Sequence, residues 1–179
     1  YLNDIMPMTD DYEFDDSHTE TIYKAIKRLR LNKEKYDKVG FILFNYIFNE
    51  KSFTNSKNKA ILFDQVLERH QLAEYVSHEL IVNLGYLFYE RYAAKDWSKL
   101  VPTILKNFND DDIVESELLF KWMDGELDEF FATHHLYKKE NDDKMKAAGK
   151  PFVDWLRPDD EDDGDDDDDQ DSDDDNDED

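Results

Sequence analysis

Apolar residues recur at helical spacing through most of the chain. In the segment after residue 17, Ile22, Ile26 and Leu29 stand at positions i, i+4 and i+7, which predicts a helix with one apolar face. Ser17 and Glu20 have the spacing of a capping box, so this helix is expected to begin there. The segment is the first amphipathic helix of the predicted fold.

The central part of the chain predicts three more helices. Residues 35–50 are apolar nearly all round and too numerous for one strand, which predicts a buried helix. Ile61, Leu62, Val66 and Leu67 predict a third helix that starts near Ser56. A fourth, longer helix is expected to run from about Leu72 to Phe88.

The C-terminal part predicts shorter helices. Pro102 can occupy the first turn of a helix that runs to about Phe108, because its missing N–H is not needed there. Asp112 is the expected cap of the next helix, and a further helix is expected over 126–136. Pro151 is expected to open a last short helix.

These patterns together predict an all-α protein. No segment alternates apolar and polar residues at period two, and the chain has only five Gly and four Pro residues. The predicted connections are short, so neighbouring helices should form antiparallel pairs. Stacked pairs of this kind would make a short α-solenoid.

Acidic residues are concentrated at the C-terminal end. The 179 residues carry a net charge of −24, and 17 of the 46 Asp and Glu residues lie within residues 159–179, which hold no Lys or Arg. Like charges at nearly every position predict that residues 158–179 form a disordered acidic tail. Residues 1–16 show no helical period and are interpreted as a linker, which leaves 17–157 as one helical domain. The chain starts at Tyr1 rather than Met, so we interpret it as part of a longer protein.

The sequence offers few candidates for catalysis or metal binding. It has no Cys, which excludes disulfides, thiolate zinc sites and a cysteine nucleophile, and it has no glycine-rich phosphate loop. All five His residues, including the adjacent His134 and His135, are expected at the surface or at helix ends. The acidic run ending in Asp112 lacks the glycine and the distal Glu of a calcium loop. We therefore expect no catalytic residue, metal or cofactor, and no apolar run is long enough to cross a membrane.

Two segments place large aromatic side chains beside carboxylates. The first runs over 115–126 and the second from Lys150 into the acidic tail. In one interpretation the aromatic residues are core anchors and the acids are solvated helix faces. In the other, which is compatible with the first, a buried tryptophan holds a helix end so that carboxylates line a surface for a lysine-rich peptide. Trp122 and Trp155 are accordingly expected to be at least partly buried, with Trp155 anchoring the final helix.

The candidate partner-binding residues follow from these two segments. They are Glu115, Glu117, Phe120, Trp122, Asp124, Glu126, Phe152, Asp154, Trp155, Asp159, Asp160, Glu161 and Asp162. A second candidate surface is the basic face of the first helix, with Lys24, Lys27 and Arg28.

Several stretches resemble the W2 domain family of translation initiation factors. Residues 150–156 (KPFVDWL), followed by acids, are similar to the C-terminal signature of these domains. Residues 101–106 (VPTILK) and 110–122 are similar to the region that precedes this signature. Residues 46–51 (YIFNEK) resemble the factor 5 type in particular, and the resemblance runs from about Ser17 to the end of the chain.

The resemblance implies a HEAT/MIF4G-like stack of antiparallel helices that serves as a hub of the translation pre-initiation complex. The implied partners are the lysine blocks of the beta subunit of initiation factor 2, the c subunit of factor 3, factor 1 and factor 4G. We expect a cytoplasmic monomer that binds no membrane, and no nucleic acid directly, because the tail repels phosphates. The GTPase-activating domain of factor 5 is expected to lie outside this chain, so no enzymatic activity is expected. The alternative is a catalytic exchange domain of the factor 2B epsilon type, which accelerates GDP release from factor 2.

Overall fold

The described part of the chain is built from helices. The computed structural model describes residues 15–30, 36–48, 53 and 56–158, and no strand occurs in these ranges. In chain order the helices are α2 (Asp16–Lys27), α3 (Tyr36–Ile47), α4 (Ser56–Arg69), α5 (Val76–Tyr86), α6 (Val101–Asn109), α7 (Ser116–Met123), α8 (Asp128–Phe131) and α9 (Lys139–Leu156), with a 3₁₀ turn (Ala73–Tyr75) before α5 and a π-helical turn (Leu87–Arg91) after it. The all-α prediction is confirmed.

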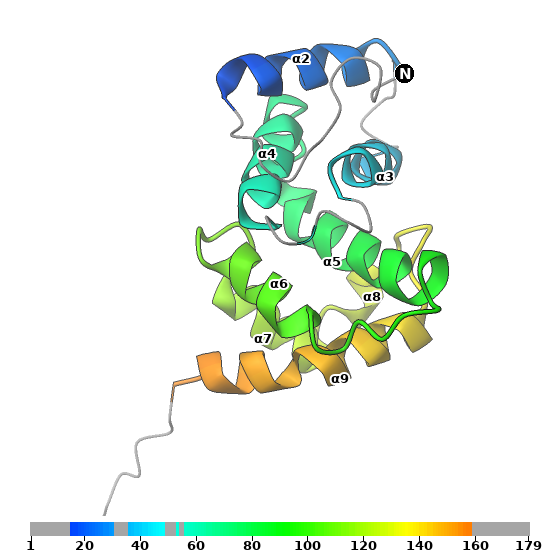
Figure 1. Ribbon diagram of the computed structural model, residues 1–179, viewed down its shortest axis with the longest axis vertical. Coiled ribbons are helices and arrows are strands. Elements are labelled where there is room, and N and C mark those ends of the chain that lie inside the picture. Colours follow the sequence, from blue (N-terminus) through cyan, green and yellow to red (C-terminus); the bar gives the residue numbers. More distant parts are fainter. Residues whose placement is uncertain (1–14, 31–35, 49–52, 54–55, 159–179) are drawn as a thin grey trace, which may run out of the picture.

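The helices stack from one end of the molecule to the other (Figure 1). α2 crosses one end and packs on α4, while α5 runs through the middle and contacts α3, α4 and α9. α6 and α7 both pack on α9, which lies across the opposite end. The N-terminal and C-terminal helices are therefore at opposite ends of the stack.

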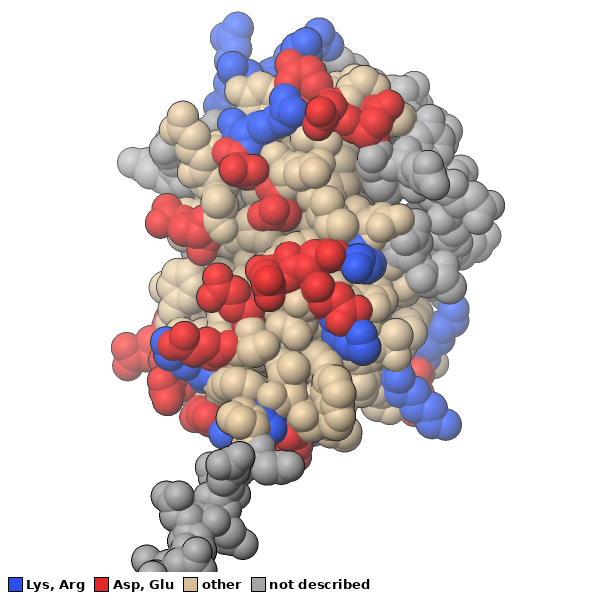
Figure 2. All heavy atoms as spheres, turned by 90° about the vertical axis from the view of Figure 1, so that its left-hand side faces the viewer, with Lys and Arg blue, Asp and Glu red and all other residues tan. Residues whose placement is uncertain are grey.

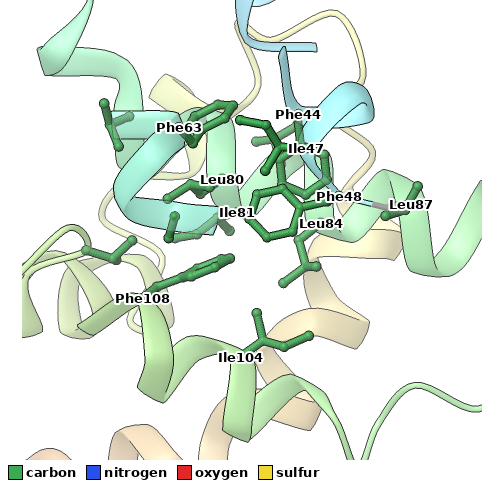
Figure 3. Close-up of a cluster of buried hydrophobic side chains, with 14 of the residues drawn as sticks. Phe44, Ile47, Phe48, Phe63, Leu80, Ile81, Leu84, Leu87, Ile104 and Phe108 are labelled. Carbon is green, nitrogen blue, oxygen red and sulfur yellow. The ribbon is translucent and has the colours of Figure 1, made fainter. Parts of the chain in front are cut away.

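The hydrophobic core is centred on α5. Figure 3 shows side chains from α3, α4, α5, the turn after α5, and α6 converging on one cluster: Phe44, Ile47, Phe48, Phe63, Leu80, Ile81, Leu84, Leu87, Ile104 and Phe108. Phe48 stacks on Phe44, with 4.5 Å between ring centroids, and meets the edge of Phe108 at 6.0 Å. α5 is buried on nearly every side, which explains why its sequence is apolar with little amphipathic contrast.

Most predicted helices are found where the apolar periodicity placed them. The buried helix expected over 35–50 is α3, the helix expected near Ser56 is α4, and the helix expected over 102–108 is α6. The long helix expected over 72–88 corresponds to α5 together with its flanking 3₁₀ and π-helical turns.

The start of the first helix is predicted wrongly by two residues. Asp15, not Ser17, is the N-cap: its carboxylate accepts hydrogen bonds from the backbone N–H groups of Ser17 (2.9 Å) and His18 (3.1 Å). The His18 ring closes the capping box by accepting from the Asp15 N–H. Ser17 thus lies inside the first turn, and Glu20 pairs with Arg69 instead of capping the helix. The hydrogen bonds from the Ser17 hydroxyl and the His18 backbone lower the pKa of Asp15 to about 2.

The same helix also ends earlier than its apolar pattern suggests. α2 stops at Lys27, so Ile22 and Ile26 are buried but Leu29 lies beyond the helix and is 45% exposed. The residue that follows, Arg30, has a positive φ of 52°, which turns the chain away.

The expected cap at Asp112 is also wrong. Asp112 lies in the loop between α6 and α7 with a positive φ of 57°, and α7 begins only after Glu115. The loop is held by the Asn109 side chain, which donates to the Val114 carbonyl (2.9 Å) and to the Ser116 hydroxyl (3.1 Å). A short polar side chain tolerates the left-handed conformation, so Asp112 serves the turn rather than the helix.

The region after α7 differs most from the prediction. The helix expected over 126–136 is reduced to α8, and Pro151 lies inside α9 instead of opening a new helix. Buried positions continue along one face of α9 on both sides of the proline: Asp142, Met145, Gly149, Phe152 and Val153. Because this stripe is continuous, packing holds α9 together across the single hydrogen bond that Pro151 cannot donate.

The described helices include no candidate membrane span. None of them combines the length and the apolar composition that crossing a bilayer requires.

Candidate partner-binding surface

The first aromatic-acidic segment is anchored by a buried tryptophan. Trp122 on α7 has no exposed surface, and its indole N–H donates to Asp142 on α9 (2.7 Å). Gly149 lets α9 approach closely, because a Cβ there would lie 2.7 Å from Leu105 and 4.0 Å from Trp122. α7 is therefore fixed against α9. The sequence made Trp122 a candidate partner-binding residue, but its burial means that it supports the surface from below and does not itself touch a partner.

The second segment presents its tryptophan to solvent. Trp155 is 71% exposed, so the expectation that it is buried and anchors the final helix is wrong. The buried stripe of α9 passes through Phe152 and Val153, and a helical turn of 100° per residue places Trp155 off that stripe. Phe152 is the actual anchor. The Trp155 ring stacks on Phe152 with centroids 6.1 Å apart.

Trp155 borders an apolar hollow between α6 and α9. The hollow has a volume of about 370 Å³ and is lined by Pro102, Thr103, Lys106, Pro151, Phe152 and Trp155. Such a hollow offers an apolar contact beside the acids of the second segment.

The two segments are joined by Arg157, the residue that follows α9. Its guanidinium donates to Asp124 at the end of α7 (2.6 Å) and lies over the ring of Phe120, 5.2 Å from the centroid. Phe120, Asp124 and Arg157 thus form one contact between the C-terminal ends of α7 and α9.

The acids that the sequence selected are exposed, but several already have partners. Glu117 binds Lys121 (2.5 Å), and Asp154 binds Lys150 (2.7 Å), in both cases one turn along the same helix. Glu115 and Glu126 are exposed at the two ends of the first segment. Asp159, Asp160, Glu161 and Asp162 lie outside the described residues.

A second group of carboxylates surrounds a groove that the sequence did not reveal. The groove has a volume of about 350 Å³ and is lined by Asp64, Ala73, Glu74, Val76, Ser77, Asp111, Asp112, Ile113, Glu115 and Leu118. Its acids come from α4, the 3₁₀ turn, the α6–α7 loop and the start of α7, while Val76, Ile113 and Leu118 supply apolar surface. Of the predicted residues only Glu115 belongs to it, because its other acids are brought together only by the tertiary fold.

Charge on this side of the molecule is unevenly distributed. Figure 2 shows Asp and Glu side chains gathered in a band across the middle of the face that carries the α6–α7 loop, with few Lys or Arg side chains beside them. Burial, reinforced by the nearby Glu68 charge, raises the pKa of Asp64 in the groove. Asp111 is paired with Lys57 (3.1 Å). This face therefore attracts cations, and its apolar strips can cover the stems of long basic side chains.

Comparison with known proteins identifies the family. A family model described as W2, eIF4-gamma/eIF5/eIF2-epsilon, matches residues 77–166, half of the chain. The chain belongs to the W2 family. The expected HEAT-like helical architecture agrees with this assignment, and W2 domains are interaction domains connected with translation initiation. The matched range starts at the second residue of α5 and includes α6 to α9 and both aromatic-acidic segments, whereas α2, α3 and α4 lie before it. No curated protein and no solved structure matches the chain.

The second candidate surface of this W2 protein lies at the other end of the stack. Lys24 and Lys27 are exposed on α2, which Figure 1 places opposite α9, and Arg28 is exposed directly after the helix. Lys24 pairs with Glu20 (3.0 Å), and the Lys27 ammonium donates to the Tyr23 hydroxyl (3.1 Å). The structure thus separates the basic candidate residues from the acidic ones.

The structure also contains a buried polar cluster that the sequence analysis missed. Contrary to the expectation for the histidines, His78 and His134 are buried, and His134 Nε2 lies 3.2 Å from the carboxyl of Glu79 on α5. Burial raises the pKa of Glu79 to about 9 and lowers the pKa values of His78 and His134 to about 4. All three groups are therefore neutral at pH 7.

The cluster fixes the segment between α8 and α9 to α3 and α5. Glu79 accepts from Asn83 (2.9 Å), and His135, which stacks on His134, pairs with Asp37 of α3 (2.6 Å). His134 Nδ1 accepts from the Leu136 N–H, so its remaining proton points from Nε2 toward Glu79. Within the described residues no group of three or more His, Cys, Asp or Glu is arranged to hold a metal ion. The cluster is a structural clamp.

Proposed function

We propose that the chain is a scaffold of the translation initiation factor 5 type that binds lysine-rich segments of the beta subunit of initiation factor 2. Through its remaining surfaces, including the basic face of α2, it would also bind the c subunit of factor 3, factor 1 and factor 4G, and so assemble the pre-initiation complex in the cytoplasm. The observation that carries this proposal is the acidic groove, lined in part by apolar residues, which adjoins the first aromatic-acidic segment at Glu115.

The chemistry of the groove suits lysine in two ways. The ammonium groups of a lysine-rich segment can meet Glu74, Asp112 and Glu115, while their aliphatic stems cover Ile113 and Leu118. A single exposed ion pair contributes only ~0–1 kcal/mol, so affinity must be spread over several of these contacts. Screening at physiological salt acts over about 8 Å, so acids far from the bound segment mainly accelerate its association.

The proposal treats the chain as a binding protein without catalytic activity of its own. Its candidate surface consists of carboxylates, aromatic rings and apolar hollows, which are suited to recognising a basic peptide.

The binding site can be tested with a synthetic twelve-residue peptide of alternating Lys and Ser. The groove variant Glu74→Gln, Asp112→Asn, Glu115→Gln removes three exposed acids. The control variant Glu129→Gln, Glu140→Gln, Asp143→Asn removes three exposed acids from α8 and the first half of α9. Both variants lose the same number of negative charges. The control also loses two ion pairs within α9, Glu140–Lys144 and Asp143–Lys139.

Titration calorimetry over a salt series measures the difference. We expect the groove variant to bind roughly tenfold more weakly than the control, since it loses three contacts of about 0.5 kcal/mol each, within the ~0–1 kcal/mol range of exposed ion pairs. Equal weakening in both variants would show that the peptide responds only to overall charge, and the groove would not be the site.

The exchange-factor alternative needs a separate measurement. Initiation factor 2 loaded with labelled GDP is mixed with the chain, and GDP release is followed over time. A scaffold leaves the release rate unchanged, whereas clear acceleration would favour an exchange domain of the factor 2B epsilon type.

A further inference from the structure

Arg157 already makes, within the chain, the contact that a partner's cation would make. Its guanidinium binds the Asp124 carboxylate at 2.6 Å and covers the Phe120 ring at 5.2 Å. A carboxylate beside an aromatic face is a good receptor for a cationic side chain, because the ring quadrupole and the negative charge attract it together. Two of the predicted partner-binding residues are thus occupied by a residue of the same chain.

This pair differs from the other ion pairs of the two segments. Glu117–Lys121 and Asp154–Lys150 each lie within one helix, four residues apart. Arg157 and Asp124 are 33 residues apart and connect the ends of α7 and α9. An external cation that takes Asp124 must therefore break a tertiary contact.

The position of Arg157 allows it to leave without disturbing α9. It is the C-cap residue, with an extended backbone (φ −64°, ψ 135°), and its N–H remains bonded to the Val153 carbonyl whatever its side chain does. The side chains of Arg157 and Asp124 are 41% and 47% exposed, so an incoming cation can reach both. Displacement requires only a rotation of the Arg157 side chain.

We propose that Arg157 is an internal competitor, which fills the Phe120–Asp124 site in the free chain and is displaced when a lysine or arginine of the partner binds there. This inference rests on the proposed function, because Phe120 and Asp124 belong to the first aromatic-acidic segment, which adjoins the acidic groove at Glu115. Its effect is to lower the affinity for basic segments in general, so that only segments offering several cations at once displace it. An exposed ion pair with a cation–π contact should reduce affinity by roughly two- to tenfold.

The test uses the alternating Lys–Ser peptide and two matched variants. Arg157→Gln removes the competitor, while Arg69→Gln removes an arginine from an ion pair of the same length, Arg69–Glu20 at 2.6 Å, near α2. Both raise the net negative charge by one. We expect Arg157→Gln to bind the peptide roughly two- to tenfold more tightly than Arg69→Gln. Equal or weaker binding would overturn the proposal.

A double-mutant cycle locates the effect. In an Asp124→Asn background the site no longer holds a cation, so Arg157→Gln should no longer increase affinity. A gain of the same size in that background would show that Arg157 acts elsewhere, against the proposal. If wild type and every variant fail to bind, the proposed function itself is wrong. If wild type binds and Arg157→Gln equals Arg69→Gln, only the internal competitor is wrong.

Discussion

The two aromatic-acidic segments place their tryptophans in opposite environments. Trp122 is fully buried and hydrogen-bonded to Asp142, whereas Trp155 is 71% exposed beside an apolar hollow. The segments have similar compositions, so composition does not decide the outcome. What decides it is the position of each ring relative to the buried stripe of its helix. The first segment supplies a rigid base, and the second supplies a ring that a partner can touch.

Replacing the buried tryptophan should have the largest effect. Trp122→Ala removes a large core side chain and leaves Asp142 without its indole partner, so we expect it to lower the free energy of unfolding by ~3–5 kcal/mol. Urea denaturation followed by circular dichroism measures this. A loss below about 1 kcal/mol would mean that the two tryptophans are equivalent and would remove the contrast.

A substitution at Glu79 tests whether the buried polar cluster of Glu79, His78 and His134 is neutral, as its burial implies. The pKa of Glu79 is about 9 in the folded chain and 4.5 in the unfolded chain, so its contribution to stability is full below pH 4.5 and is lost as the pH rises to 9. Glu79→Gln cannot ionise. We expect it to match wild type at pH 4.5 and to be more stable by about 1–3 kcal/mol at pH 9.

Thermal melts across pH 4.5–9 measure this difference, with the exposed Glu140→Gln as the control. His78 and His134 act in the opposite sense: their pKa values are about 4 against 6.5, so their contribution is present above pH 6.5 and is lost as the pH falls to 4. That acid-side loss should persist in Glu79→Gln. A variant that tracks wild type at every pH would contradict a protonated Glu79.

Asp142 accepts the hydrogen bond of Trp122 from α7 and also pairs with Lys146 of its own helix (3.0 Å), and two substitutions separate these interactions. Asp142→Ala leaves the indole N–H of Trp122 buried without an acceptor, and we expect a loss of about 1–3 kcal/mol. Asp142→Asn keeps an acceptor and should lose less, since Lys146 retains its pair with Asp128 (2.6 Å). Equal losses in urea denaturation would mean that the charge matters more than the hydrogen bond.

The smallest effect on stability is expected at the exposed ring. Trp155→Ala should change the free energy of unfolding by no more than ~0.5 kcal/mol, because the ring is largely solvated and Phe152 remains as the anchor. The same denaturation experiment checks this. A loss above 1 kcal/mol would place Trp155 in the core after all.

The sequence predicts the helices well because the buried side of a helix carries apolar residues that recur at the helical period. α3, α4 and α6 lie where apolar spacing placed them, and the W2 match agrees with the family that the C-terminal signature suggested. Helix ends are predicted less well because neighbouring polar side chains compete for the same backbone groups. Asp15 takes the cap that Ser17 could have provided, and packing carries α9 through Pro151.

The site is predicted only where its residues are adjacent in sequence. The two aromatic-acidic segments are visible as local patterns, but Asp64 and Glu74 join Glu115 only through the packing of different elements. No local sequence pattern predicts that Asp64 and Glu74 belong to the site. The burial of His78 and His134 likewise depends on contacts between residues about 55 positions apart in the sequence. The apolar periodicity of a single helix does not predict such contacts.

Gly40 packs so closely against Glu79 that the order in which these two residues are substituted matters. A Cβ at Gly40 would lie 1.9 Å from the Glu79 carboxyl oxygen and 2.6 Å from its Cγ, so Gly40→Ala forces a buried side chain out of place. Once Glu79 has been shortened to Ala, the same substitution at position 40 meets none of these atoms. A lineage of such proteins can therefore lose the glycine readily only after losing the glutamate, and the reverse sequence of substitutions passes through an overpacked intermediate.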